Sequence, residues 1–223
     1  MNNMLLQDRE NWLSRWRENR IGFHQDTPSP MLVECWDRIG APDDARVFVP
    51  LAGKSVDMPW LAEHGYRVFG VELAELAVQQ FFAEQQLEHD IETRADGTLY
   101  RSGPIELLLG NVFALGDELA TCNAVFDRAA IIALPRDLRI RYAREVYGQL
   151  PRGCVGLMIT LEYPQHQKSG PPFSVTEEEV RELFEPEWEI EVLVRRDILK
   201  YQQSFQDEGV TALQAVAYRM QKR

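Results

Sequence analysis

The chain has 223 residues, of which 45% are hydrophobic and 26% are charged, a composition typical of one globular domain. Its 35 acidic and 24 basic residues leave a formal net charge of −11. This balance argues against nucleic acid or an anionic membrane surface as a partner, because both attract clustered Lys and Arg. The longest apolar stretch, residues 154–161, is far shorter than the roughly 18 residues of a membrane span. Residues 1–6 also lack the apolar core of a signal peptide.

The cysteine and histidine residues favour neither a disulfide nor a metal site. Cys35, Cys122 and Cys154 are odd in number and far apart, as is typical of reduced thiols that pack as small buried hydrophobes. The four histidines never fall at metal-ligand spacing from one another or from a cysteine. We therefore expect a cytoplasmic protein that binds no metal through its own side chains. We also expect a monomer.

Short runs of β-branched and aromatic residues alternate along the chain with amphipathic helical stretches. Trp12, Leu13 and Trp16 share one face of the first helix, and Thr176 with Glu179 form a capping-box pair. In chain order the pattern predicts helices at 8–19, from Ser29-Pro30 to Gly40, and at 55–64, 74–87, 137–150 and from Thr176 to near Pro186. It predicts strands at 46–50, 67–72, 105–109, 124–127, 155–161, 188–196 and 211–220, and an edge hairpin at 91–101 centred on Asp96-Gly97.

This alternation indicates an α/β fold in one domain. We expect a doubly wound, mostly parallel sheet of seven strands with helices on both faces. The last two strands are close enough in sequence to pair with each other, which makes the C-terminal strand antiparallel. Ligands in such sheets lie beyond the carboxyl ends of the strands, so candidate functional residues belong there.

The loop after the first strand contains a glycine that suits a ligand site. Gly53 lets the backbone approach a ligand closely, and Ser55 can cap the following helix. Gly53-Lys54-Ser55 is similar to the tail of a phosphate-binding P-loop, but that loop needs a glycine where Phe48 stands. A dinucleotide fingerprint would keep only one of its glycines here. The loop therefore favours a ligand that does not rest on phosphate groups.

Glu72 stands nineteen residues beyond Gly53, at the end of the second strand. An acid at this position accepts hydrogen bonds from the two ribose hydroxyls of an adenosine ligand. S-adenosylmethionine carries no phosphate, so it needs close backbone and ribose contacts, and its cationic sulfonium suits an acidic, aromatic-lined pocket. The glycine loop and the acid together favour an adenosine ligand without identifying it. Because neither phosphate-binding loop is complete, S-adenosylmethionine is the better candidate for the cofactor.

Several separated motifs resemble the thiopurine S-methyltransferase family, its bacterial members especially. The order and spacing of these motifs extend the resemblance over nearly the whole chain. They are Trp12-x-x-x-Trp16-x-x-Asn19 followed by IGFHQ at 21–25, VFVPLAGKS at 47–55 with GVE at 70–72, FDRAA at 126–130, and GPPF at 170–173. The resemblance implies a Rossmann-like methyltransferase with residues 1–40 as an N-terminal helical lid and residues 41–223 as a cofactor-binding α/β core.

The resemblance also implies a role for each matching residue. Arg128, at the end of the fourth strand, would lie near both cofactor and acceptor. From the chemistry of its guanidinium we also expect Arg128 to steady the negative charge of the acceptor, with Asp127 as a weaker candidate for orienting it. Phe23 would pack against the acceptor, and the segment around Pro172 would close over it. The remaining cofactor-binding residues would be Trp12, Trp16, Leu51, Gly53, Glu72, Asn111 and Val112. The product of the cofactor would be S-adenosyl-L-homocysteine.

The chain departs from the family pattern near its C-terminus. Relatives carry basic residues just before a glycine that matches Gly209, whereas residues 204–209 here include Asp207 and Glu208, and the nearest upstream basic residue is Lys200. This departure leaves the expectation of a methyltransferase unchanged but weakens the expectation that a thiopurine is the acceptor. The GPPF run follows the fifth strand rather than the fourth, which argues against methylation of a nucleic-acid base.

The reaction implied is displacement at the sulfonium methyl group by a thiolate or selenolate of a small molecule. Such a nucleophile can arrive already ionised, so the protein contributes alignment and charge placement rather than a base. Two alternatives stay open at this point. The same fold could methylate another small acceptor (a halide, thiocyanate or hydroxyl), or the chain could bind the cofactor without turnover.

Overall fold

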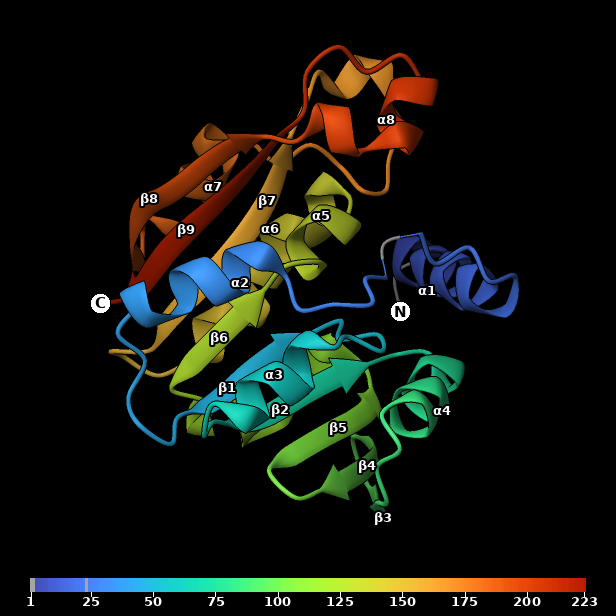
Figure 1. Cartoon of the computed structure of the whole chain (residues 1–223). Helices are drawn as coiled ribbons and strands as arrows, with labels where there is room; N and C mark the ends of the chain where they lie inside the picture. Colours follow the sequence, from blue (N-terminus) through green and yellow to red (C-terminus); the bar gives the residue numbers. More distant parts are fainter. Residues whose placement is uncertain (1–2, 23) are drawn as a thin grey trace.

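The computed structural model of the chain describes residues 3–22 and 24–223, with side chains from residue 8 onward (Figure 1). Its helices are α1 (Asn3–Arg17), α2 (Pro30–Cys35), α3 (Asp57–Glu63), α4 (Glu75–Glu84), α5 (Ala130–Ala133), α6 (Arg136–Glu145), α7 (Glu177–Phe184) and α8 (Gln203–Asp207). Its strands are β1 (Arg46–Pro50), β2 (Arg67–Glu72), β3 (Asp90–Arg94), β4 (Gly97–Ser102), β5 (Ile105–Gly110), β6 (Ala124–Asp127), β7 (Val155–Glu162), β8 (Trp188–Asp197) and β9 (Gln214–Lys222).

All of these strands join one sheet, in the order β3-β4-β5-β2-β1-β6-β7-β9-β8. The strands from β5 to β7 run parallel, and β9 lies antiparallel between β7 and β8. The predicted fold class is confirmed: the seven predicted strands form, and the two strands of the predicted hairpin extend the sheet at one edge through β4. Ligand sites are therefore expected at the carboxyl ends of β5, β2, β1, β6 and β7.

The turn of the hairpin differs by one residue from the prediction. Arg94 pairs with Gly97 across β3 and β4, so Ala95 and Asp96 form the turn and Gly97 begins β4. A Cβ atom on Gly97 would lie 2.2 Å from the carbonyl oxygen of Leu109. Gly97 is therefore required by the close approach of β4 to β5, and its φ of +152° also favours glycine.

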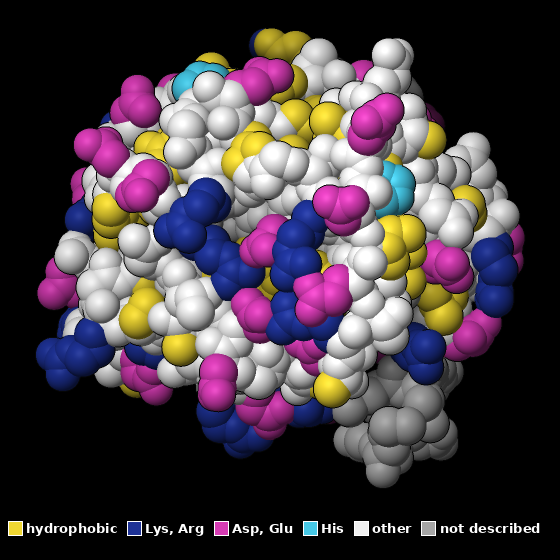
Figure 2. Space-filling model, turned by 90° about the horizontal axis from the view of Figure 1, so that it is seen from below, with side chains coloured by type: hydrophobic (Ala, Val, Ile, Leu, Met, Phe, Trp, Pro, Cys, Tyr) yellow, Lys and Arg dark blue, Asp and Glu magenta, His cyan; other side chains and the backbone are white. Residues whose placement is uncertain are grey.

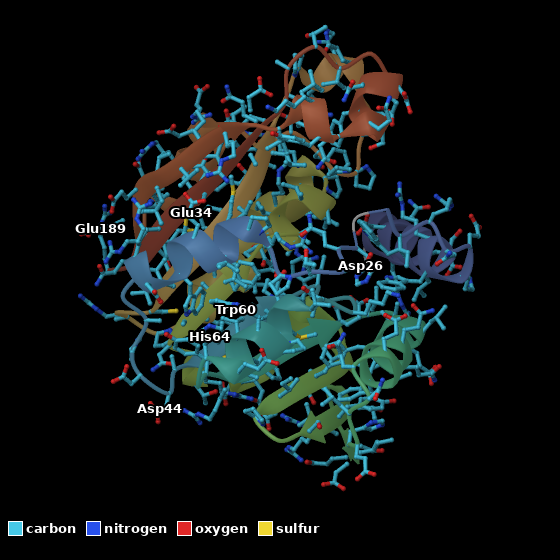
Figure 3. All side chains as sticks on the ribbon, in the orientation of Figure 1. Asp26, Glu34, Asp44, Trp60, His64 and Glu189 are labelled. Carbon is cyan, nitrogen blue, oxygen red and sulfur yellow. The ribbon has the colours of Figure 1, made fainter. Side chains whose placement is uncertain are left out.

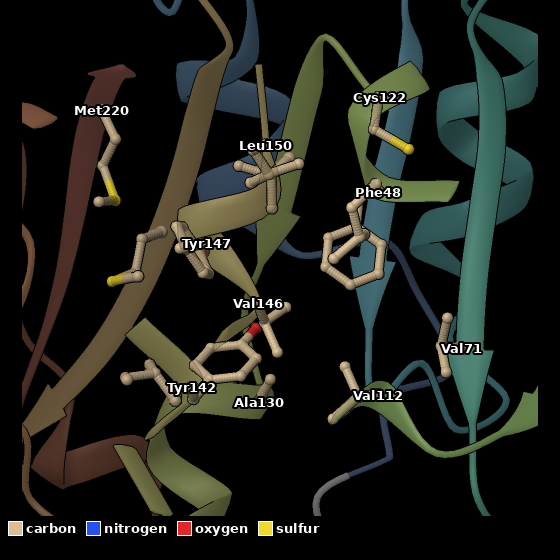
Figure 4. Close-up of a cluster of buried hydrophobic side chains, with 14 of the residues drawn as sticks. Phe48, Val71, Val112, Cys122, Ala130, Tyr142, Val146, Tyr147, Leu150 and Met220 are labelled. Carbon is tan, nitrogen blue, oxygen red and sulfur yellow. The ribbon is translucent and has the colours of Figure 1, made fainter. Parts of the chain in front are cut away.

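Successive side chains of β1 point to opposite sides of the sheet, and both faces of the sheet are buried. Phe48 of β1 packs on the face covered by α5, α6 and α7, whereas its neighbours Val47 and Val49 pack on the face covered by α2, α3 and α4. This is the period of two expected of a strand buried on both sides. Figure 4 shows the first of these clusters, with Tyr142 and Tyr147 among the side chains that fill it.

Two predicted helices end at least four residues earlier than expected. The second ends at Cys35 because the chain tightens into a 3-10 turn at Trp36–Arg38 before Gly40, whose φ is +72°. The helix predicted at 137–150 ends at Glu145, since the chain turns there and inserts Tyr147 into the core. Neither change displaces the strands that follow: the bounds of β7 and β8 agree with the prediction to within one residue, and those of β9 to within three.

Charged side chains of both signs cover the face seen in Figure 2. Across the amino-terminal side of the sheet, Arg46 bridges Glu106 at 2.6 Å and Glu118 at 2.9 Å, and Arg101 also binds Glu106, at 3.0 Å. Trp60 on α3 and His64, which follows the last residue of that helix, stack with ring centroids 3.8 Å apart (Figure 3). Among the residues described, no helix has the length and apolar character to cross a membrane.

Candidate active site

A cavity of about 1280 Å³ lies at the carboxyl ends of the parallel strands. It is bounded by the first helix, by the loops after β1, β2, β5 and β6, and by segments near β7 to β9. Nine residues predicted from the sequence line it together: Trp12, Trp16, Leu51, Gly53, Glu72, Asn111, Val112, Arg128 and Pro172. Phe23, predicted to contact the acceptor, lies outside the described residues.

The loop after β1 adopts left-handed backbone angles at two residues. Such angles are common for glycine and rare for leucine. Leu51 and Gly53 both adopt positive φ angles, +46° and +55°, and the N–H of Ala52 donates to the carbonyl of Val71 at 2.9 Å. A Cβ atom on Gly53 would lie 3.3 Å from Cζ2 of Trp16. The absence of a side chain at Gly53 therefore lets the Trp16 ring lie directly against the loop.

Glu72 is the buried acid of this wall. Its Oε2 accepts from the N–H of Gly53 at 2.8 Å, and its Oε1 accepts from the N–H groups of Leu73 and Ala74, both at 2.7 Å. Burial raises the pKa of Glu72 above its ordinary value, while these backbone hydrogen bonds act in the opposite direction. A carboxylate offers about four lone-pair sites, so this one keeps capacity for about one further donor.

Asn111 and Val112 follow β5 at the neighbouring strand end. The side-chain oxygen of Asn111 accepts from the N–H of Phe113 at 3.0 Å, which fixes the turn, and Val112 is buried. The hairpin turn brings Asp96 and Gly97 to the same part of the cavity. Beside Glu72, the cavity therefore has an edge with polar and apolar side chains, from Asn111 and Val112, against which a flat base can lie.

The first helix closes one side of the cavity with aromatic side chains. Trp16 is 5% exposed and packs with Ala74 and Ala77 at the start of α4, and Arg15 lies 5.4 Å from the centroid of the Trp12 ring. Figure 1 shows α1 set apart from the sheet, on the side where the strands end. The two tryptophans are therefore part of the cavity wall rather than of the main core.

Arg128 reaches the cavity from the end of β6, and its partner is not the one predicted. Its Nε donates to Oδ2 of Asp57 at 3.0 Å. The prediction that Asp127 orients Arg128 is not what the structure shows. Asp57, which the sequence analysis did not identify, occupies that position because the first turn of α3 faces the end of β6.

Asp127 points into the core instead. Its Oδ2 accepts from the hydroxyls of Tyr142 at 2.8 Å and Tyr147 at 3.1 Å, and its Oδ1 accepts from the N–H groups of Ala130 and Ile131. Burial raises the pKa of Asp127 to about 6, although these four hydrogen bonds lower it. The side chain holds the start of α5 against β6 and does not face the cavity.

The GPPF segment is tied to the sheet beside the cavity mouth. The hydroxyl of Tyr163 donates to the carbonyl of Pro172 at 2.6 Å, and the N–H of Phe173 donates to the carbonyl of Ile132 at 2.7 Å. Pro171 and Pro172 therefore form wall rather than a separate turn on the surface.

Several cavity residues escaped the sequence analysis, and Lys168 matters most among them. Its ammonium pairs with Glu208 and lies 5.2 Å from the centroid of the Phe205 ring. Arg196 also lines the cavity and pairs with Glu34 at 2.9 Å. Residues 204–209 thus receive a basic partner from the loop after β7, and the only sequence signal for Lys168 is its place two residues before the GPPF run.

The cavity residues fit S-adenosylmethionine. Glu72 offers a free acceptor site for a ribose hydroxyl, and Gly53 keeps the loop free of a side chain beside it. Asn111 and Val112 bound the adjacent edge, and Trp16 covers the loop. No group of three His, Cys, Asp or Glu side chains suited to a metal occurs within residues 3–22 and 24–223.

Comparisons with known sequences agree with this geometry. The sequence model of the thiopurine S-methyltransferase family matches residues 7–223. A thiopurine S-methyltransferase of Xanthomonas axonopodis pv. citri (strain 306) is 51% identical over 213 residues, which cover 95% of this chain and 98% of the relative. That of Bordetella pertussis (strain Tohama I) is 50% identical over 216 residues, covering 96% of this chain and 99% of the relative.

Solved structures share the fold at low sequence identity. The 1,6-didemethyltoxoflavin-N1-methyltransferase of Burkholderia thailandensis, with 1,6-didemethyltoxoflavin and S-adenosylhomocysteine bound, aligns with a TM-score of 0.65 at 17% identity, over 96% of this chain and 86% of that chain. A SAM-dependent methyltransferase from Methanosarcina mazei aligns with a TM-score of 0.61 at 15% identity, over 87% and 97%. Taken with the sequence matches, these findings confirm the predicted family: the chain belongs to the thiopurine S-methyltransferase family and is an S-adenosylmethionine-dependent methyltransferase.

Proposed function

We propose that the acceptor is the sulfur of a small heterocyclic or aromatic thiol, thiopurines among them. The observation that carries the proposal is that one cavity joins the buried carboxylate of Glu72 to the guanidinium of Arg128. The curated relatives are named for thiopurines. Selenium and tellurium nucleophiles belong to the same class, because they too are soft and ionise readily.

The cofactor occupies the part of the cavity next to β1, β2 and β5. Glu72 takes a ribose hydroxyl, Gly53 and Leu51 lie along the ligand, and Asn111 with Val112 flank the adenine. Trp12 and Trp16 cover it from α1. When bound, S-adenosylmethionine supplies a methyl group on a cationic sulfonium. The support for this assignment is that these residues come from four different segments and line one cavity.

The acceptor occupies the part lined by Arg128, Lys168 and Pro172. Ile159, Leu161 and Phe205 supply apolar surface there, which suits a flat ring. Arg128 and Lys168 balance a negative charge on the acceptor, since a guanidinium stays protonated and Glu208, the partner of Lys168, has a side chain 48% exposed that can return to solvent. The acidic window at 204–209 therefore does not exclude an anionic acceptor.

The protein's contribution to the reaction is alignment and charge placement. A thiolate arrives ionised, so no proton has to be removed at the site. Arg128 holds the acceptor with its sulfur directed at the methyl group, and the apolar wall keeps water away from it. Holding two reactants in line is worth roughly 7–11 kcal/mol relative to free collision, so orientation accounts for much of the rate.

We also propose how the chain is organised for this work. Residues 1–40 act as a lid over a core formed by 41–223, supported by the contact of Trp16 with Gly53 and Ala74. The chain works as a monomer in the cytoplasm, without nucleic acid as a partner. The free, buried thiols of Cys35, Cys122 and Cys154 suit a reducing compartment.

The acceptor is tested with S-adenosylmethionine labelled in its methyl group. Transfer is measured to a panel of neutral thiols, anionic thiols, thiopurines, selenium and tellurium oxyanions, halides and thiocyanate. We expect the highest kcat/KM for ring thiols that carry negative charge. Transfer only to halides or thiocyanate, or cofactor binding without any transfer, would contradict the proposal.

A further inference from the structure

A buried carboxylate behind the cavity wall links three segments of the site. Asp57, in the first turn of α3, is 1% exposed. Its Oδ1 accepts from the backbone N–H of Ser29 at 2.7 Å, and its Oδ2 accepts from the hydroxyl of Ser55 at 2.9 Å and from Nε of Arg128 at 3.0 Å. Three donors therefore meet two carboxylate oxygens at one point.

The three donors come from parts of the chain that build different walls. Ser29 precedes α2, where the N-terminal segment joins the core. Ser55 belongs to the loop after β1, and Arg128 begins the loop after β6. Ser29 and Arg128 line the cavity. Asp57 contacts both Ser29 and Arg128. Among the described residues it is not one of those that line the cavity, so it lies behind the wall.

We propose that Asp57 is a positioning residue that holds Arg128 for the methyl acceptor. With Nε bound to Asp57, the two Nη groups of Arg128 keep their donors for a ligand in the cavity. A long flexible side chain loses rotational freedom when it is held in this way. The side chain of Arg128 is then already ordered before the acceptor binds, so its ordering adds no entropic cost to the reaction. This inference rests on the role proposed above for Arg128.

Only a carboxylate satisfies these three donors. An amide has one acceptor oxygen and one donor group. In Asp57→Asn, the amide NH2 would therefore face either the N–H of Ser29 or the donors of Ser55 and Arg128, and one contact becomes donor against donor. Glutamate keeps both oxygens and reaches the same partners with an extra methylene.

The test is a double-mutant cycle on Asp57 and Arg128 in the full-length protein, with a thiol as acceptor. We expect Asp57→Asn to lower kcat/KM for the acceptor about ten- to a hundredfold, the cost of misplacing a catalytic group by about 1 Å. Asp57→Glu should recover part of the loss. In the Arg128→Ala background, Asp57→Asn should cause no further loss, because its effect passes through Arg128.

Two controls separate positioning from folding. Glu106→Gln removes a carboxylate that binds Arg46 and Arg101 near the amino ends of the strands, and should leave kcat/KM unchanged. Affinity for S-adenosylhomocysteine, measured by calorimetry, should be the same for Asp57→Asn and wild type. Should Asp57→Asn fail to fold, Asp57→Glu alone and with Arg128→Ala gives the same cycle.

The outcomes are distinct. An equal loss from Asp57→Asn with and without Arg128 would overturn the inference, and so would a loss that appears only as weaker cofactor binding. A wild-type protein that binds the cofactor but transfers no methyl group to any thiol would instead refute the proposed function.

Discussion

The carboxylate of Glu72 accepts a hydrogen bond of 2.8 Å from the backbone N–H of Gly53, and this contact joins the loop after β1 to the end of β2. The same carboxylate accepts from Leu73 and Ala74, which begin the approach to α4. One buried side chain therefore sets the shape of the proposed ribose site and also keeps an acceptor for the ligand. Glu72 therefore has both a structural role in the loop and a proposed role in ribose binding, and a substitution affects the two together.

Glu72→Gln should weaken cofactor binding. The amide NH2 must face at least one of the three backbone N–H groups, and the remaining oxygen has less capacity for a ribose hydroxyl. A hydrogen bond to a charged group is worth about 1.5–3 kcal/mol, so we expect at least about a tenfold loss of affinity for S-adenosylhomocysteine. Calorimetry measures it, with the exposed Glu63→Gln as a control. Unchanged affinity would remove Glu72 from the site.

Gly53→Ala should lower both stability and cofactor affinity. Gly53 has a φ of +55°, and an added Cβ would lie 3.3 Å from Trp16. A left-handed conformation costs a non-glycine residue about 1–2 kcal/mol. Gly103→Ala is a matched control, because Gly103 has a φ of +54° and open space around it.

We expect both alanine variants to lose stability in thermal unfolding, and only Gly53→Ala to bind S-adenosylhomocysteine more weakly. Equal affinity in the two variants would mean that the contact between Trp16 and Gly53 does not bear on the cofactor.

Arg128→Ala should impair turnover more than cofactor binding. Loss of one hydrogen-bond donor that stabilises negative charge in the transition state lowers kcat by about 10²-fold at comparable sites. We expect kcat/KM for an anionic thiol to fall by about this factor, and the loss for a neutral thiol to be smaller. Steady-state kinetics with both acceptors measure it. Turnover equal to wild type would remove the assignment.

Asp127 should make stability depend on pH in a defined direction. Its folded pKa is about 6, whereas an unfolded aspartate titrates near pH ~3.9. The folded protein therefore binds a proton that the unfolded chain does not, and the stabilisation is present at low pH and lost as pH rises through about 6.

Urea unfolding of wild type and Asp127→Asn measures this effect. The difference in free energy of unfolding, wild type minus variant, should be larger at about pH 5 than at about pH 7.5 by about 1 kcal/mol, in favour of the wild type. The same difference at both pH values would contradict a raised pKa at Asp127.

The strands and the cofactor wall follow from local sequence. β1, β2 and β6 begin and end where predicted, because each is a short buried apolar run between turn residues. Gly53 and Glu72 could then be placed together, since the carboxyl ends of neighbouring parallel strands meet at one edge. The positive φ of Leu51 has no such signal, because leucine rarely adopts it and only the packed loop enforces it.

The partners of the charged residues could not be read in the same way. Asp57 and Arg128 are 71 residues apart in sequence, and Lys168 and Glu208 are 40 apart. Which carboxylate meets which cation depends on how α3 and the loop after β7 pack on the sheet. The adjacent pair Asp127-Arg128 was therefore misleading, since successive residues at a strand end point to opposite faces.

The central claim is that one cavity aligns a thiol with S-adenosylmethionine, and the position of the transferred methyl group tests it most directly. Wild-type protein is incubated with methyl-labelled S-adenosylmethionine and mercaptopurine, and the product is analysed by mass spectrometry and NMR. The account predicts one labelled methyl group on the sulfur. A methyl group on a ring nitrogen, or no transfer by a protein that binds S-adenosylhomocysteine, would contradict it.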